Sequence, residues 1–202
     1  MQKLLLTPPS GYQAVEEGLY RCHGPLAPKH IPFLESLSIT AIVNVSSEPI
    51  FVPSSSSSNS GIDLSAIAMH NIPMDLTSNT IHLQTIFDAL ELIFSLHKFK
   101  ILLIGDTKLN FDCLLVACIR RLQRFSMTSL LSEYRFNSTL RNFDAEQLIE
   151  SLDRESMLLA CCSTHIPSYI EAFAKENKAK KRLLFPLILT LQFLFLAFNA
   201  II

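Results

Sequence analysis

The residues best placed to do chemistry lie in a loop at residues 105–112, between a strand-like and a helix-like stretch. Residues 101–104 form an uninterrupted apolar run, typical of a buried parallel strand, and a helix is expected over residues 113–125. In open α/β sheets, ligands bind beyond the carboxyl end of such a strand, where the next helix offers unpaired N–H groups to an anion. The sequence therefore predicts that any anion site lies at residues 105–112.

This loop holds few groups that could carry out a reaction. Thr107 has a hydroxyl that could attack a substrate, but no histidine or other base accompanies it in the loop. Lys108 is a point charge without the fork of an arginine. Asp106 and Asp112 add negative charge where an anion would have to lie, and Asp112 is the expected N-cap of the next helix. Conventional nucleophilic catalysis is not expected from this set.

A cysteine and an arginine separated by five residues occur further along, as Cys118 and Arg124. Both lie in a helix-forming segment without glycine, and almost two helical turns separate them, so they cannot curl around one phosphate. We expect a buried thiol and a surface arginine instead. Arg124 would then share a solvated helix face with Arg120 and Arg121.

Other potentially reactive residues do not form a second site. Asp75 follows the preceding strand, and without a nucleophile to serve as general acid it is interpreted as a turn or capping residue. Cys161 and Cys162 are either plain thiols or sites of lipid acylation upstream of a hydrophobic segment. The histidines show no metal-type pairing, so no metal or other cofactor is expected; they are His23, His30, His70, His82, His97 and His165.

Composition narrows the class of protein further. The formal net charge is −1, so no global field draws the chain toward nucleic acid, and no nucleic-acid partner is expected. The cysteine count is odd at 5, and no pair has the spacing of a redox or zinc motif. Reduced thiols in the cytoplasm are the simplest interpretation.

The elements that position the loop alternate between strand-like and helix-like segments. Strands are expected at residues 18–22, 41–45, 66–74 and 101–104. Helices are expected at residues 31–37, 81–97, 113–125, 127–136 and 143–152, with Thr80 as the candidate cap of the second. This order predicts the α/β class, with a small, mostly parallel sheet flanked by helices.

Changes in composition divide the chain into a domain and a tail. Residues 1–155 form the expected domain, with a serine-rich flexible insertion at 53–61, and residues 156–182 form a polar and basic linker. The last segment, Leu183 to Ile202, carries no charge and as a helix would span a bilayer core. Basic residues just before it predict a cytosolic N-terminal side, as in a tail anchor on an intracellular membrane. The alternatives are a core helix, an interfacial helix, or a segment that appears in the sequence only because the gene boundaries were drawn incorrectly.

Several short blocks, in order and at fixed spacing, point to a family. They are Leu-Thr-Pro-Pro at 6–9, Glu-Gly-Leu-Tyr-Arg-Cys at 17–22, Pro-Phe-Leu-Glu-Ser-Leu at 32–37, Glu-Pro at 48–49, Ala-Cys-Ile-Arg-Arg-Leu-Gln-Arg-Phe at 117–125, and Ser-Glu-Tyr-Arg at 132–135. Over roughly residues 5–150 the chain resembles the atypical dual-specificity phosphatases of fungi and plants. This tyrosine-phosphatase-like group is linked to oxidant response and inositol pyrophosphates. The resemblance implies a cysteine-phosphatase-like fold.

The resemblance also implies a His-Cys-x5-Arg loop, in which a thiolate attacks phosphorus and an arginine holds the equatorial oxygens. Counting back from the block at 120–123, the histidine, cysteine and arginine positions fall on Ile104, Gly105 and Phe111. The chain therefore looks like a catalytically degenerate fungal member with no catalytic residue. The phosphate-loop remnant is Gly105, Asp106, Thr107, Lys108, Leu109, Asn110 and Phe111.

These patterns predict a pseudophosphatase that acts as a scaffold or regulatory subunit for related phosphatase-like proteins. Two alternatives remain open: an active protein-tyrosine or inositol-pyrophosphate phosphatase with an unusual loop, and a sensor that binds a phosphate ligand without cleaving it. A thiol and an arginine meeting across one pocket would contradict the prediction of an inert scaffold.

Overall fold

A computed structural model describes residues 6–47, 49–51, 67–72, 83–96 and 98–160. The strands are β1 (Gln13–Glu16), β2 (Leu19–His23), β3 (Ala41–Asn44), β4 (Ala68–Asn71) and β5 (Ile101–Gly105). The helices are the 3-10 turn η1 (Pro28–His30) and the α-helices α1 (Ile31–Ser36), α2 (Leu83–Ser95), α3 (Phe111–Leu122), α4 (Met127–Asn137), α5 (Phe143–Ser151) and α6 (Arg154–Ala160).

The strands form one mixed sheet in the order β1-β2-β5-β3-β4. Only β1 is antiparallel to its neighbour; β2 with β5, β5 with β3, and β3 with β4 are parallel. The predicted α/β class with a mostly parallel, helix-flanked sheet is confirmed. Strand β1 was not predicted, because it is four residues long and follows a proline-rich stretch. Its turn into β2 depends on Gly18, whose φ of 82° is a left-handed conformation that favours glycine.

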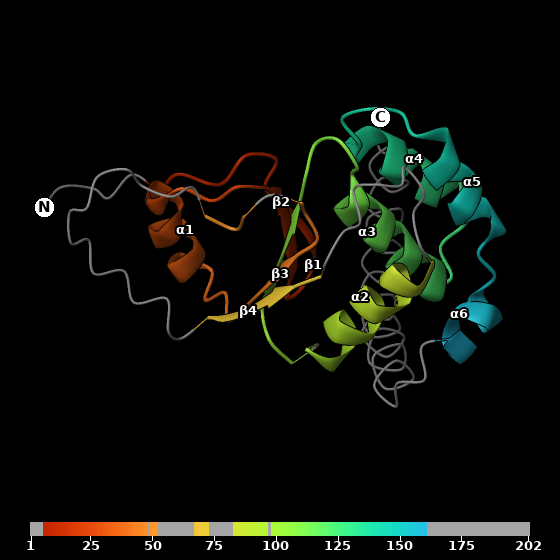
Figure 1. Ribbon diagram of the computed structural model, residues 1–202, viewed down its shortest axis with the longest axis horizontal. Helices are drawn as coiled ribbons and strands as arrows, with labels where there is room; N and C mark the ends of the chain where they lie inside the picture. The colour runs from red at the N-terminus through yellow and green to blue at the C-terminus, as the bar shows by residue number, and fades with distance from the viewer. Residues whose placement is uncertain (1–5, 48, 52–66, 73–82, 97, 161–202) are drawn as a thin grey trace, which may run out of the picture.

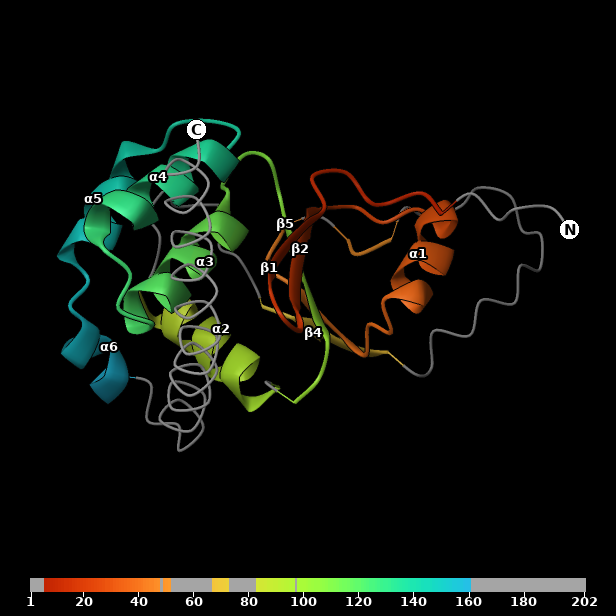
Figure 2. The same cartoon turned by 180° about the vertical axis from the view of Figure 1, so that it is seen from behind.

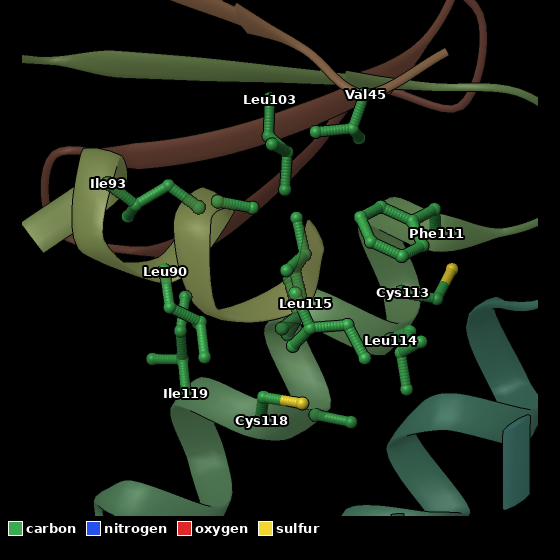
Figure 3. Close-up of a cluster of buried hydrophobic side chains, with 14 of the residues drawn as sticks. Val45, Leu90, Ile93, Leu103, Phe111, Cys113, Leu114, Leu115, Cys118 and Ile119 are labelled. Carbon is green, nitrogen blue, oxygen red and sulfur yellow. The ribbon is translucent and has the colours of Figure 1, made fainter. Parts of the chain in front are cut away.

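Helices cover the two faces of the sheet unequally. Figure 1 shows α1 on one side and α2 to α6 on the other, and Figure 2 shows the same layers from behind. The larger core lies between the sheet and the helical layer. In Figure 3, Leu103 and Val45 on the sheet side face Leu90 of α2 and Phe111 and Leu115 of α3.

Helix α3 is the central helix of this layer, because it contacts β5 as well as α2, α4, α5 and α6. Nearly every residue from Phe111 to Leu122 is therefore buried, as expected for a helix that is enclosed on all sides. Helix α6, which was not predicted, crosses the expected domain boundary at residue 155. Its Met157 is fully buried in the same core, so the folded domain continues through this helix.

Several sequence predictions lie outside the described residues. These are the serine-rich insertion at 53–61, Thr80, Asp75, the cysteines at 161 and 162, and the candidate anchor at 183–202. None of the helices in the described part of the chain combines the length and the apolar composition that a membrane span requires. Membrane insertion of residues 183–202 therefore stays a prediction from the sequence.

Candidate active site

The candidate loop begins where β5 ends, at the carboxyl edge of the parallel strands. Gly24 N donates to Gly105 O at 2.9 Å, and Val45 N donates to Ile104 O at 2.9 Å. These bonds join the end of β5 to the segments that follow β2 and β3. The site therefore has the strand–loop–helix position that the sequence predicts for an anion site.

The N–H groups of the loop bond to a carboxylate from the loop itself. Asp106 Oδ1 accepts hydrogen bonds from Lys108 N at 2.9 Å and from Leu109 N at 2.6 Å. Asp106 is buried, whereas the side chains of Thr107 and Lys108 are exposed. The two N–H groups that could otherwise face a bound phosphate thus donate to a carboxyl group of the loop itself.

A second carboxylate fills the space beside Gly105. The ideal Cβ of any larger residue at position 105 would lie 2.0 Å from Asp112 Oδ1 and 2.3 Å from Asp112 Cγ. Asp112 is in the first turn of α3 and is fully buried. The position that the resemblance assigns to a nucleophilic cysteine therefore has no room for a side chain.

Phe111, at the position assigned to the arginine, points into the core. Its side chain is 1% exposed, and Figure 3 shows its ring beside Val45. The ring therefore belongs to the packing between α3 and the sheet, away from any ligand in the loop.

Asn110, rather than the predicted Asp112, is the residue that caps α3. Its φ of 49° lies in the left-handed region, which asparagine tolerates better than most residues. Its side chain accepts from Thr139 N at 3.1 Å and Thr139 Oγ1 at 3.0 Å, and it donates to Leu140 O at 3.4 Å. The prediction that Asp112 caps the helix was wrong, because Asp112 is already the second residue of α3 and its Oδ2 accepts from Arg21.

A buried cluster of Arg21, Asp112 and Cys113, which the sequence analysis did not predict, lies next to the loop. Arg21 of β2 donates from Nη1 to Cys113 Sγ at 2.8 Å and to Asp112 Oδ2 at 3.4 Å, and from Nε to Gln13 Oε1 at 2.8 Å. Cys113 is 2% exposed, and its thiol also lies 3.5 Å from Asn137 O. A thiol and a guanidinium thus do meet, but inside the core, where the space that Arg21 and Cys113 line has no room for a ligand.

Burial decides the protonation of this cluster. It raises the pKa of Cys113 to about 12, with Asp112 adding to the shift and Arg21 opposing it. Burial also raises the pKa of Asp112, although Arg21 and His23 each lower it. The long contact with Arg21 and the unpartnered Asp112 Oδ1 make burial the larger effect. The Cys113 thiol is therefore protonated near neutral pH, when it is a poor nucleophile.

The predicted basic face of α3 is only partly correct. Arg120 is buried and bonds to Glu16 at 3.2 Å, to Glu133 at 3.2 Å and to Val15 O at 2.7 Å, so its predicted exposure was wrong. Cys118 is buried and Arg124 is exposed, as expected. Among the described residues no three metal-ligating side chains gather in one place.

This fold and site can be compared with known proteins. A family profile described as "Tyrosine phosphatase family" matches residues 6–164, so the chain belongs to this tyrosine phosphatase family. A Scheffersomyces stipitis protein named "Putative tyrosine-protein phosphatase OCA1" is 31% identical over 165 residues, which cover 74% of this chain and 77% of that protein. Inositol diphosphatase DSP3 of Arabidopsis thaliana is 25% identical over 140 residues, 68% of this chain and 66% of the plant protein.

A solved structure supports the same fold. The core catalytic domain of the PP-IP phosphatase SIW14 from S. cerevisiae, solved with citrate, superposes with a TM-score of 0.62 at 24% identity. The superposition covers 86% of this chain and 96% of that one. At this identity the likeness concerns the fold alone, a mixed sheet flanked by helices as in cysteine phosphatases.

Proposed function

We propose that this protein is a pseudophosphatase, which binds other proteins as a scaffold or regulatory subunit and does not turn over a phosphate ester. The observation that carries the proposal is the Asp112 carboxylate packed against Gly105, where a Cβ would lie 2.0 Å from Oδ1. A cysteine nucleophile needs that space, and its thiolate would face a carboxyl group. Asp106 adds a second acidic side chain to the same loop.

The chemistry of phosphoryl transfer explains why this arrangement is unsuited to catalysis. The developing charge on the equatorial oxygens needs preorganised donors, typically loop N–H groups and a bidentate arginine. Here the N–H groups of Lys108 and Leu109 bond to Asp106, and Phe111 replaces the arginine. Losing one such donor typically costs on the order of 10²–10³ in rate. Loss of the nucleophile as well should reduce turnover to the uncatalysed level.

Related phosphatase-like proteins are the proposed partners. A chain that keeps the family fold without the family's reactive groups can still associate with relatives, and an active relative would then supply the chemistry. Quantitative co-purification of the tagged full chain at native abundance tests this. Recovery of family members in stoichiometric amounts is expected, whereas purification without any relative would contradict the partner proposal.

A second candidate function is an unusual active phosphatase, with relatives named inositol diphosphatase and tyrosine-protein phosphatase in its favour. The specific observation is the 2.8 Å contact between Cys113 Sγ and Arg21 Nη1. The raised pKa of Cys113 and its burial oppose this function, because a substrate would need α3 to separate from β2 and α4. Turnover abolished by Cys113→Ser in a variant that still folds would favour it over the pseudophosphatase.

A sensor that binds phosphate ligands without cleavage can be tested separately. Titration calorimetry of the full chain with inositol polyphosphates would release heat saturably for a sensor and none for a protein scaffold. The internal bonds to Asp106 favour the scaffold, because a ligand would first have to displace that carboxylate.

A further inference from the structure

A hollow outside the candidate active site lies between the end of α4 and the start of α5. Its volume is about 190 Å³, and its lining residues are Arg135, Ser138, Arg141 and Glu146. We call this surface, together with the neighbouring Leu140 and Phe143, the α4–α5 corner. The candidate active-site chemistry uses none of these side chains.

The corner has two guanidinium groups that share one carboxylate. Arg135 donates to Glu146 from Nε at 3.0 Å and from Nη2 at 2.7 Å, and Arg141 Nε lies 3.4 Å from the same carboxylate. These bonds lower the pKa of Glu146, so it stays ionised near neutral pH. Two guanidinium groups and one carboxylate leave one positive charge on the lining. Two further carboxylates lie nearby: Glu150 acts on Arg135, and Asp144 follows Phe143 in the first turn of α5. Both are exposed to solvent, which screens their charge.

Apolar side chains stand next to this charge. Leu140 is 62% exposed and Phe143 is 65% exposed, and the Arg141 guanidinium lies 4.4 Å from the centre of the Phe143 ring. Phe136, next to Arg135 in the last turn of α4, is 86% exposed. Aromatic residues and arginine are enriched at the centres of protein–protein interfaces, and exposed apolar side chains that gather in one place mark interaction sites more than single ones do.

The loop at the head of α3 holds the corner in place. Asn110 forms three hydrogen bonds to Thr139 and Leu140, the residues directly before Arg141. Cys113 Sγ contacts Asn137 O at the end of α4. A surface fixed in this way loses little conformational entropy when it binds. The remnant of the phosphate loop therefore supports the turn that presents Arg141.

We propose that the α4–α5 corner binds an acidic segment of a partner protein. One aspartate or glutamate carboxylate lies at Arg135 and Arg141, and an adjacent apolar side chain packs on Phe143 and Leu140. This inference rests on the proposed function as a binding protein, and it assigns partner binding to the α4–α5 corner. The hollow is smaller than the roughly 300–1,000 Å³ of small-molecule sites, which favours one side-chain group over a whole free ligand.

The test uses the full chain with a photo-crosslinking phenylalanine analogue in place of Phe143, in cells that express the protein naturally. The matched control has the analogue in place of Phe99, which is 51% exposed on the connection between α2 and β5. We expect a partner protein to be crosslinked from position 143. The same partner should not be crosslinked from position 99. Mass spectrometry of the crosslinked peptide should show an acidic residue within a few positions of an apolar one.

The crosslinked segment, made as a synthetic peptide, is then titrated against the full chain. Arg141→Glu should weaken binding roughly 30-fold, the loss typical of a hot-spot arginine, and added salt should weaken binding to the unaltered chain. The control Lys98→Glu, a charge reversal at an exposed residue beside Phe99, should change affinity less than about twofold. Equal melting temperatures of both variants exclude unfolding as the cause.

Three results would overturn the inference: no crosslink specific to position 143, a crosslinked segment without an acidic residue, or full displacement of the peptide by inositol hexakisphosphate. The last would make the corner a small-molecule site. Turnover is measured on the same preparations. Turnover dependent on Cys113 would contradict the proposed function. Failure of the crosslinking alone would contradict only the assignment of the α4–α5 corner as the binding surface.

Discussion

The carboxylate of Asp112 occupies the space that a side chain at Gly105 would need, with Oδ1 2.0 Å from the position of a Cβ. The two residues are seven apart in sequence, at the end of β5 and in the first turn of α3. Glycine at 105 and aspartate at 112 therefore fit each other, and neither position can change without affecting the other.

Replacing Gly105 by alanine should destabilise the protein by about 1–3 kcal/mol, as for an overpacked core, because the short, buried Asp112 side chain cannot move away freely. Urea unfolding of Gly105→Ala, Asp112→Ala and the double variant gives the coupling energy. The double variant should lose less stability than the sum of the single variants. Additive losses would show that the two side chains do not compete for one space.

The Asp112 carboxyl should make stability depend on pH in a defined direction. Burial raises its pKa in the folded protein above the ordinary value of 3.8. The folded state therefore holds this proton more tightly than the unfolded chain, and its contribution is greatest below the ordinary pKa and lost as pH rises through the folded pKa. Relative to Asp112→Asn, the unaltered protein should lose stability over the range in which the pH rises from the ordinary value of 3.8 to the higher pKa of folded Asp112. A relative gain over that range would mean that Arg21 lowers the pKa overall.

Cys113 should react with iodoacetamide only when the protein opens. With a pKa of about 12, the thiolate fraction near pH 7 is on the order of 10⁻⁵, and the sulfur is buried. Site-resolved mass spectrometry should find rapid alkylation of Cys113 in urea and slow alkylation in native buffer. Fast native alkylation at Cys113 would indicate an activated, accessible thiol and would favour the active-phosphatase alternative.

Asn110 should support both α3 and the turn before α5. Asn110→Gly keeps the left-handed backbone but leaves Thr139 N without its acceptor, at a cost of about 1–3 kcal/mol. Asn110→Ala should be no more stable than the glycine variant, because alanine is strained at a φ of 49°. Denaturant unfolding measures both, and hydrogen exchange at Thr139 reports the turn. An unchanged exchange rate in Asn110→Gly would contradict this role.

The sequence predicted most of the fold, because its signals are local. The apolar run at 101–104 marks β5, and helical spacing marks α2, α4 and α5. The position of the candidate loop followed from that order of elements. Strand β1 was not predicted because its four residues show no clear alternation of apolar and polar side chains, and because its pairing depends on a turn at Gly18.

The missed parts of the site depend on partners that are distant in sequence. Arg21 bonds to residues 91 and 92 positions away, and Arg120 bonds to Glu16 across 104 positions, so their burial could not be predicted from neighbouring residues. The available signal was the position of Arg21 in a strand between Tyr20 and Cys22, which could have indicated a buried charge. Asp112 has a local preference for capping a helix, but the left-handed backbone at Asn110 starts the helix earlier.

The central claim is that this family member lacks a reactive centre, and phosphate release by the full chain tests it most directly. The assay compares the unaltered protein with Cys113→Ser and with the double variant Thr107→Ala, Lys108→Ala, on p-nitrophenyl phosphate, a phosphotyrosine peptide and an inositol pyrophosphate. All three proteins should release phosphate at the rate of the buffer alone. Release by the unaltered protein that either variant abolishes while remaining folded would contradict the claim.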